Sequence, residues 1–570
     1  MKKNINYVYD VPQILTLRDL LERSAELYAE RPAFAVLAGR EVAEISYATF
    51  YADVAGLATQ LQALGLGGKK IALIGRNCYH WAVSYFAVTA GCGVVVPFDK
   101  EYKAGEVANL AADADIAAIL YAAEQEEKVE GLPESILRLP FDRFSDYIAA
   151  GRELIEAGDR RWAEHAGKID PRALGVLIYT SGTTGVAKGV MLSQYNICAN
   201  LTGILRVIEI YPEDRTLSVL PMHHTYECMA GFLCMLASGA SISFNGSIRT
   251  IQADFARYRP TVFIAVPLLL EKLHSKIVGK YASMKGGKAI LAAQRAMARA
   301  NPAGARKIFS AVHKVFGGRL RAVMCGAAAL APEVFRDLET FGITMYNGYG
   351  LTETAPVLMV HRDNYRAPGD VGPALPGVTA KIDAPNEEGV GELIVRGPNV
   401  MLGYYNNPDA TAEVIRDGWF HTGDLVRCDA KTGAYSIVGR CKTMIVTKNG
   451  KKIFPEEIEY YVGLSPYVAE CMAFGAADKD GDVKVTVAIY PDTEALAAAG
   501  LDSTDVCYAS EVEALLKEAV KAANRSLPTF KHIGRLIIRR EPFVKTTTQK
   551  IRRNAPENQA ESAAESGAEA

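Results

Sequence analysis

The chain has 570 residues, more than the roughly 250 to 300 that one hydrophobic core supports, so we expect two or more domains. Its 63 basic and 65 acidic residues leave a net charge of -2, which gives no indication of a nucleic-acid partner. The ten cysteines are scattered without metal-site spacing and are typical of buried thiols in a reducing compartment.

No segment predicts export or membrane insertion. The first residues include two lysines but no apolar run behind them, which is not the pattern of a signal peptide. No apolar stretch approaches the roughly 20 residues that a membrane-spanning helix needs. We therefore expect a cytoplasmic protein, with peripheral membrane contact left open, and the sequence predicts no particular oligomeric state.

The first hundred residues alternate predicted helices with short strands, which indicates a parallel sheet with right-handed crossovers. Thr16 is suited to cap the first helix and Gly65 to end the second. The hydrophobic pattern predicts strands at 33–37, 44–47, 70–75 and 92–98 and helices at 48–64 and 79–91. Residues 123–170 are charged, and we expect an irregular connection there.

A loop rich in glycine and hydroxyl side chains, residues 179–189, lies between two apolar runs that predict buried strands. Its glycines let the backbone approach a ligand, and its hydroxyls, its free N–H groups and Lys188 suit phosphate oxygens. It is not a Walker A loop, because Gly189 follows the lysine and a strand comes next. The candidate phosphate-binding residues are Thr180, Ser181, Gly182, Thr183, Thr184, Gly185 and Lys188.

Several predicted strands follow, and the segment from 217 ends in a polar cluster that contains His223 and His224. Two adjacent histidines on an extended segment point in opposite directions, so one of them can be purely structural. Further strands are expected at 241–244, 261–267 and 319–325. The last of these closes on Gly326, where small residues leave room at the carboxyl edge of the sheet, and ligands of open parallel sheets bind at that edge.

Two later motifs carry groups that suit a nucleotide. The segment 346–356 contains Asn347, Gly348, Tyr349 and Gly350, in which an aromatic between two glycines offers a flat face to a purine. Glu353 adds a carboxylate that could ligate a cation bound to phosphate. Further on, Asp424 follows the tight turn at Gly418 and is suited to accept hydrogen bonds from the two hydroxyls of a ribose.

The composition changes at Arg440 to Lys442, where we place a domain boundary. The predicted fold class is α/β, with a large N-terminal domain of parallel-rich sheets and flanking helices and a small, mobile C-terminal α+β domain. The expected domains are 1–440 and 441–553, and the composition of 554–570 predicts a disordered tail.

These motifs, in this order, resemble those of the adenylate-forming enzymes, the superfamily of acyl-CoA synthetases, adenylation domains and luciferases. The resemblance rests on five stretches between residues 15 and 553, namely 179–189, 349–354, 418–425, 439–459 and 545–550. Within the superfamily the chain is most similar to long-chain fatty acyl-CoA synthetases, on the evidence of His223 to Glu227, Gly231 to Leu233 and the segment that ends at Lys550.

The resemblance implies an acid–thiol ligase of fatty acid metabolism that uses ATP, Mg²⁺ and coenzyme A. In this interpretation residues 180–188 hold the β- and γ-phosphates, with Gly326, Asn347, Gly348 and Gly350 lining the nucleotide site. Thr352 contacts the α-phosphate, Glu353 ligates Mg²⁺ and Tyr349 stacks on adenine. Asp424 binds the ribose beside Arg440, and His224 borders the carboxylate site. Lys442 is the hinge residue, Lys550 is the mobile lysine of adenylation, and Gly450 lines the path of the CoA pantetheine.

Three positions depart from the usual family pattern, namely Ala187 for proline, Gln194 for histidine and Gln549 for glycine. None of them removes a charged catalytic group. Ligases for aryl or medium-chain acids, and ligases that load acyl carrier protein, would show the same motifs. A non-catalytic nucleotide-binding sensor is the alternative from another class, although the presence of Glu353, Asp424, Arg440 and Lys550 together argues against it.

Overall fold

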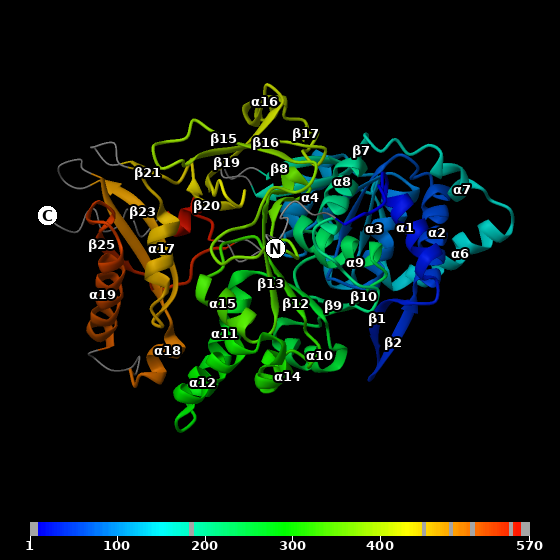
Figure 1. Ribbon diagram of the computed structural model, residues 1–570. Helices are drawn as coiled ribbons and strands as arrows, with labels where there is room; N and C mark the ends of the chain where they lie inside the picture. Colours follow the sequence, from blue (N-terminus) through cyan, green and yellow to red (C-terminus); the bar gives the residue numbers. More distant parts are fainter. Residues whose placement is uncertain are drawn as a thin grey trace.

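The computed structural model describes residues 9–181, 187–446, 452–477, 483–501, 508–545 and 551–559. Figure 1 shows the N-terminal elements, drawn in blue and cyan, on the right of the molecule and the C-terminal sheet and helices on the left. Two large sheets with helices around them form the right and central parts. The predicted fold class, parallel-rich sheets with flanking helices followed by a smaller α+β unit, is confirmed.

The largest sheet within the described ranges has eight strands and is parallel except at its two edges. Its antiparallel edge pairs are β1 with β2 and β13 with β14. In spatial order its strands are β14 (Val357–Val360), β13 (Thr344–Gly350), β12 (Ala322–Cys325), β11 (Val262–Ala265), β9 (Arg215–Ser218), β10 (Ser241–Phe244), β1 (Pro32–Ala38) and β2 (Glu41–Ser46).

A second sheet has seven strands in the part of the chain that is described, with a parallel centre and an antiparallel edge at β7, β8 and β17. In spatial order its strands are β17 (Gly403–Tyr404), β8 (Ala187–Ser193), β7 (Leu174–Ser181), β4 (Val94–Phe98), β3 (Lys70–Ile74), β5 (Ala118–Tyr121) and β6 (Leu137–Pro140). The predicted phosphate loop therefore joins two neighbouring antiparallel strands. Thr180 and Lys188 face each other across this pair, so they lie on the strand ends and not in the loop itself.

The strands alternate their side chains between separate apolar cores, which builds a layered molecule. Phe34, Phe50, Phe86 and Phe232 meet between the two sheets, with the centroids of neighbouring rings 4.9 to 5.6 Å apart. The helices of this middle layer include α1 (Leu17–Tyr28), α2 (Tyr47–Ala63), α3 (Tyr79–Gly91), α8 (Gln194–Leu205) and α9 (Cys234–Ala237). Residues 227–233 form a π-helix that leads into α9.

The outer faces of the two sheets carry their own helices. The eight-stranded sheet is covered by α10 (Ile251–Tyr258), α11 (Pro267–Ala282), α12 (Gly287–Ala300), α13 (Ala305–Ile308), α14 (Ser310–Val315) and α15 (Pro332–Thr340). The seven-stranded sheet is covered by α4 (Ala104–Ala114) and α5 (Glu126–Val129). None of the helices in the described ranges has the length and apolar character needed to cross a membrane.

Residues 123–170 are more regular than their charge pattern predicts. They supply α5, β6, α6 (Phe144–Glu156) and α7 (Arg161–Ala166), and β6 extends the seven-stranded sheet beside β5. Helix α6 packs so closely on α2 that a Cβ at Gly151 would lie 1.8 Å from the carbonyl oxygen of Gly56. The expectation of an irregular connection is therefore wrong, because tertiary packing stabilises these short elements.

An antiparallel sheet follows, built from β15 (Thr379–Asp383), β16 (Gly391–Arg396), β18 (Ile415–Arg416), β19 (Trp419–Cys428) and β20 (Tyr435–Arg440), with α16 (Pro408–Val414) beside it. The C-terminal unit contains β21 (Ile445–Val446), β22 (Lys452–Ile453), α17 (Pro455–Gly463), β23 (Val468–Ala477), β24 (Val483–Pro491), α18 (Thr493–Ala498), α19 (Tyr508–Ser526) and β25 (Ile533–Ile538). Its core, which includes Ile458, Val487 and Leu516, forms a separate apolar cluster.

The end of the described chain packs against this unit. Asn558 is 2% exposed, and its amide bonds the backbone of Val544 and Arg552. The described part of the predicted tail, residues 554–559, is thus tied to this unit through the Asn558 side chain. The remaining residues of the predicted tail lie outside the described ranges.

Candidate functional site

Asp424 joins two of the sequence motifs. It lies within β19, directly opposite Arg440 on β20, and its Oδ1 accepts a hydrogen bond from Arg440 Nε at 2.8 Å. Its Oδ2 accepts one from the hydroxyl of Tyr349 at 2.6 Å. Burial, and next the charge of Asp424, raise the pKa of the Tyr349 hydroxyl well above its usual value, so this hydroxyl stays protonated and keeps donating. The carboxylate is 3% exposed and is held in one orientation by two neighbours.

Glu353 and Lys188 come together around Tyr404. The Tyr404 hydroxyl donates to Glu353 Oε1 at 2.8 Å, and Lys188 Nζ lies 4.9 Å from the centroid of the Tyr404 ring. Tyr404 reaches this position because β17 pairs with β8, the strand that carries Lys188. A carboxylate at the hydroxyl and an ammonium over the ring of one tyrosine form a pair of groups suited to a phosphate and its counterion.

The small residues of the predicted nucleotide site gather at the carboxyl ends of β12 and β13. These strands are parallel, with Cys325 opposite Asn347, and Gly326 and Gly348 are the next residue of each segment. Asn347 Oδ1 is buried and has no hydrogen-bond partner among the described residues, which leaves an acceptor unused there. A Cβ at Gly350 would lie 1.9 Å from the carbonyl oxygen of Pro356, so only glycine fits at that position.

Thr352 and Glu353 lie on a short 3₁₀ turn, Thr352–Thr354, that follows β13. The turn is fixed by the Thr354 hydroxyl, which donates to the carbonyl oxygen of Pro356 at 2.6 Å. It is also held by the carbonyl of Glu353, which accepts from the backbone N–H of Met401. These two hydrogen bonds fix the backbone around Glu353 and thereby the position of its carboxylate.

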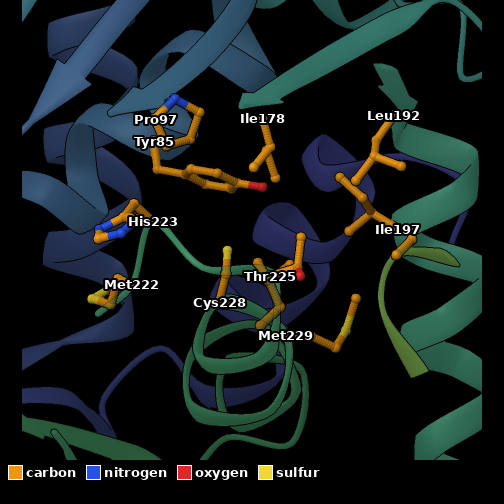
Figure 2. Close-up of a pocket in the computed structure, with 12 residues that line it drawn as sticks. Tyr85, Pro97, Ile178, Leu192, Ile197, Met222, His223, Thr225, Cys228 and Met229 are labelled. Carbon is orange, nitrogen blue, oxygen red and sulfur yellow. The ribbon is translucent and has the colours of Figure 1, made fainter. Parts of the chain in front are cut away.

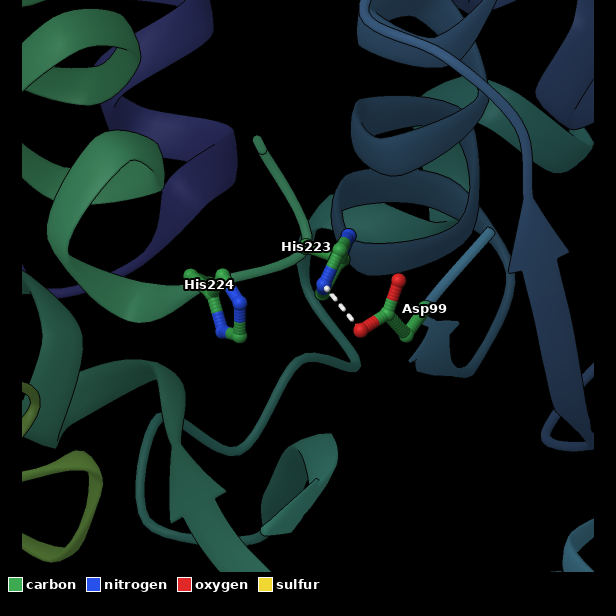
Figure 3. A group of neighbouring side chains, drawn as sticks. All are labelled: Asp99, His223 and His224. Carbon is green, nitrogen blue, oxygen red and sulfur yellow. Dashed lines mark ion pairs between the residues drawn. The ribbon is translucent and has the colours of Figure 1, made fainter. Parts of the chain in front are cut away.

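His223 and His224 lie on a turn and not on the predicted extended segment, because β9 already ends at Ser218. Their rings are 4.2 Å apart, so the expectation that they point in opposite directions is wrong. Figure 3 shows His223 beside Asp99, with its Nε2 3.4 Å from Asp99 Oδ2. One ligand atom from each of Asp99, His223 and His224 lies within 4.8 Å of the others, so within the described ranges these three residues form a group that could hold a metal ion.

An apolar pocket borders this histidine pair. Its lining includes Tyr85, Ile178, Leu192, Ile197, His223, Thr225, Cys228, Met229, Leu233 and Ala355. Figure 2 shows the Tyr85 ring and Ile178 on one side of this space, with Cys228 and Met229 on the helical turns across from them. The cavity volume is about 20 Å³, enough for about one water molecule, so a larger occupant requires the side chains to move. Two methionines, Met222 and Met229, lie in the lining and can adapt their shape.

Beside this pocket, Glu227 is a buried carboxyl group that the sequence motifs do not explain. It opens the π-helix, is 1% exposed, and accepts a hydrogen bond from the Ser218 hydroxyl at 2.6 Å. Burial raises the pKa of Glu227 to about 8. A Cβ at Gly231 would lie 2.5 Å from Glu227 Oε1, so the glycine leaves the room that this carboxyl occupies.

Gln194 proves to be structural. Its side chain accepts from the backbone N–H of Leu17 and donates to the carbonyl oxygen of Thr89, which ties the start of α1 to α3. Six predicted site residues lie outside the described ranges, namely Gly182, Thr183, Thr184, Gly185, Gly450 and Lys550. Lys442 is exposed and lies two residues after the end of β20.

Sequence reasoning missed Tyr404 and Asp99. Tyr404 stands in a glycine–tyrosine–tyrosine stretch without charged groups, and Asp99 follows a buried strand by one residue. The only signal for Asp99 was its place at the carboxyl end of β4, where ligands of parallel sheets bind. The contacts of Tyr404 depend on strand pairing between distant segments, which one sequence does not reveal.

Comparison with known proteins agrees with this arrangement. Residues 21–405 match the model of the AMP-binding enzyme family, and residues 442–566 match that of the AMP-binding enzyme C-terminal domain. The chain is 28% identical over 555 residues to the long-chain-fatty-acid–CoA ligase FadD15 of Mycobacterium bovis, covering 87% of this chain and 88% of that protein. It is also 28% identical to long-chain-fatty-acid–CoA ligase 5 of Rattus norvegicus, covering 83% and 75%.

Among solved structures, the adenylation domain of a carboxylate reductase from Mycobacterium chelonae superposes with a TM-score of 0.77 at 22% identity, covering 98% of this chain and 91% of that chain. ATP-bound MatB from Rhodopseudomonas palustris superposes with a TM-score of 0.72 at 24% identity, covering 94% and 97%. These similarities concern the fold. The family model spans well over half of the sequence, and the chain therefore belongs to the AMP-binding enzyme family.

Proposed function

We propose that this protein activates a long-chain fatty acid with ATP and then transfers the acyl group to the thiol of coenzyme A. In the first step the carboxylate attacks the α-phosphorus, giving an acyl-adenylate and pyrophosphate. In the second step the thiol attacks the carbonyl of the mixed anhydride and AMP leaves. The proposal has the support of the family membership and of relatives named as long-chain-fatty-acid–CoA ligases.

One structural observation carries the proposal. The segment that begins at Tyr349, bonded to Asp424, passes through Glu353 and ends at Ala355, which lines the apolar pocket. The candidate nucleotide groups and the apolar pocket therefore share one short stretch of chain. A carboxylate held in the pocket would face the nucleotide phosphates across this segment, which is the arrangement that acyl transfer to AMP requires.

The residues divide the work as follows in this proposal. Asp424 binds the ribose hydroxyls, and Lys188 with the loop before it binds the outer phosphates. Glu353 is the carboxylate that would hold Mg²⁺, whose charge offsets that of the phosphates when it is bound. His224 borders the acid, and the acyl chain follows the pocket lined by Met229 and its neighbours.

Charge repulsion is the main obstacle to the first step. Two like charges ~4 Å apart repel by about 4 kcal/mol at an effective dielectric constant of about 20. Lys188, and above all Lys550, would lower this repulsion and follow the charge that moves onto the bridging oxygen. Lys550 and Gly450 both belong to the small C-terminal unit, so we infer that this unit rotates about Lys442 to serve the two steps in turn.

A ligase for aromatic or medium-chain acids is the second candidate. A volume of about 20 Å³ admits neither acid unless the lining side chains move, and an aromatic or medium-chain acid requires the smaller movement. In the long-chain proposal the side chains at Met222 and Met229 move apart on binding. The two candidates therefore differ in how far the pocket opens.

A pyrophosphate-release assay tests the proposal. Fatty acids of graded chain length and a set of aromatic acids are each supplied with ATP, and either coenzyme A or acyl carrier protein is the acceptor. The long-chain proposal predicts the highest kcat/KM with long-chain acids and coenzyme A. A maximum with aromatic or medium-chain acids establishes the second candidate, and ATP binding without any acid-dependent pyrophosphate release indicates a nucleotide sensor.

A further inference from the structure

The segment that covers one end of the eight-stranded sheet has an unusual charge composition. Between residues 272 and 321 the chain has twelve Lys and Arg residues and no Asp or Glu. The chain as a whole has a net charge of -2, so basic residues are concentrated here and not simply abundant. Such a concentration of one sign creates a local positive potential that an anionic partner can use.

These residues begin in a helical hairpin, α11 followed by α12, which we call the basic hairpin (residues 267–300). Figure 1 shows the hairpin at the lower end of the molecule, with the loop between its helices at the outermost point. Six of its cationic side chains are exposed, namely Lys272, Lys276, Lys280, Lys285, Lys288 and Arg299. None of the six forms an ion pair with an Asp or Glu in the described ranges, whereas Arg295 is paired with Asp337.

The cations of α11 form a stripe. Lys272, Lys276 and Lys280 follow one another at four-residue intervals and therefore lie along the same side of the helix. The stripe continues through Lys285 in the loop to Lys288 at the start of α12. Cations thus line one side of α11 and continue through the loop to the start of α12.

The outer side of α12 is apolar. Leu291 and Ala298 are its buried core-facing residues, and the residues on the opposite side are Ala289, Ala293 and Ala296. Ile290 and Met297, seven residues apart and so on one face, flank this side with 43% and 57% of their surface exposed. Met284 at the tip of the hairpin is 50% exposed. The α12 sequence contains no acidic residue.

We propose that the basic hairpin binds the surface of an anionic lipid bilayer. A helix that lies in a membrane interface combines an apolar side, which enters the acyl boundary, with Lys and Arg, which contact the headgroups. A second copy of this chain is disfavoured, because each hairpin brings six unpaired cations to the contact. An acidic protein would leave the alanine and methionine side of α12 without a complementary function, whereas a bilayer uses both features.

Co-sedimentation of the full-length protein with vesicles tests the proposal. We expect binding to vesicles of equal parts phosphatidylcholine and phosphatidylglycerol, weak binding to pure phosphatidylcholine, and loss of binding at high salt. Replacing Lys276, Lys280, Lys285 and Lys288 together by Gln is expected to weaken binding on the order of 10²- to 10³-fold, because each lysine near an anionic surface contributes about a factor of five.

The matched control replaces four exposed cations elsewhere, Arg23, Arg40, Lys381 and Lys431, by Gln and changes the net charge equally. This control is expected to bind within about threefold of wild type. Ile290→Gln with Met297→Gln tests the apolar side and is expected to reduce binding without altering the circular dichroism spectrum.

Equal loss in the control and hairpin variants, or equal binding to neutral vesicles, would overturn the proposal. The proposal would also be overturned if the protein binds no vesicles and instead forms a concentration-dependent dimer that Ile290→Gln with Met297→Gln abolishes. That result assigns the apolar side of α12 to contact with a second copy of the chain. Because binding is measured by sedimentation, the outcome is independent of the proposed ligase activity.

Discussion

Lys550 is the side chain that separates the two proposed half-reactions. In the proposed mechanism, its ammonium is required only while negative charge builds up between the acid and ATP. We expect Lys550→Ala to slow adenylate formation by on the order of 10² or more, the scale of removing one preorganised charge. Thioester formation from a pre-made acyl-adenylate should be largely retained. The two steps are measured separately, by pyrophosphate release and by CoA-thioester formation, and an equal loss in both contradicts the assignment.

The buried carboxyl of Glu227 predicts a pH dependence of stability. Burial raises its pKa in the folded protein to about 8, whereas a Glu in an unfolded chain has a pKa of about 4.3. The folded state therefore binds this proton more tightly, and the free energy of unfolding contributed by Glu227 falls as the pH rises from about 5 to about 8. Glu227→Gln keeps the shape of the side chain and removes the titration.

Urea denaturation at pH 5 and pH 8 measures this effect. Between the two pH values the wild type is expected to lose stability relative to Glu227→Gln by on the order of a few kcal/mol, since one pKa unit corresponds to about 1.4 kcal/mol. Glu387→Gln, at an exposed position, is the control and should follow the wild type. Parallel curves for wild type and Glu227→Gln show that the carboxyl does not titrate in this range.

At the scale of elements, the contact between α2 and α6 depends on two glycines. A Cβ at Gly151 would lie 1.8 Å from the carbonyl oxygen of Gly56, so Gly151→Ala must push the helices apart. We expect a loss of about 2 to 3 kcal/mol in the free energy of unfolding. The control is Gly279→Ala in α11, where a Cβ would have no atom within 4 Å. This substitution should stabilise the protein by about 0.5 to 1 kcal/mol, because alanine favours the helix more than glycine does. If both variants are destabilised by a similar amount, the loss comes from replacing a glycine within a helix and not from the contact between α2 and α6.

The contact between α2 and α6 also illustrates which parts of the fold could be predicted from the sequence and which could not. Continuous apolar runs predicted strands such as β3 and β4 close to their observed bounds, because those strands are buried on both faces. Helix α6 was not predicted, because its sequence is rich in charged residues. The face that it buries is defined only by its packing on α2. In the site, the motifs identified Asp424 and Glu353, but their partners Tyr349 and Tyr404 come from strands that meet only in the fold.

At the scale of the whole molecule, the C-terminal unit has its own core. Ile458, Val487 and Leu516 belong to a cluster that does not merge with the cores of the two large sheets. We therefore expect calorimetry to show two unfolding transitions, the smaller one from this unit. Arg553 contacts both oxygens of Glu459 at 2.6 Å within it, so Arg553→Ala should lower only the smaller transition.

The control for this prediction is an ion pair in the N-terminal part. Arg152 Nη2 lies 2.6 Å from Asp53 Oδ1, between α6 and α2, so Arg152→Ala should lower only the larger transition. A single transition that moves equally in both variants indicates that the two parts unfold as one cooperative unit, and it argues against independent rotation of the C-terminal unit.

The two hydrogen bonds to the Asp424 carboxylate affect which nucleotide sugar the proposed site would accept. Arg440 and Tyr349 each bond one oxygen of this carboxylate, which fixes its orientation. In the proposed nucleotide site, the two neighbouring hydroxyls of a ribose would use the remaining lone pairs of this carboxylate. Deoxy-ATP would leave one lone pair unsatisfied and is expected to bind about tenfold more weakly, so a rigid side chain selects between the two sugars.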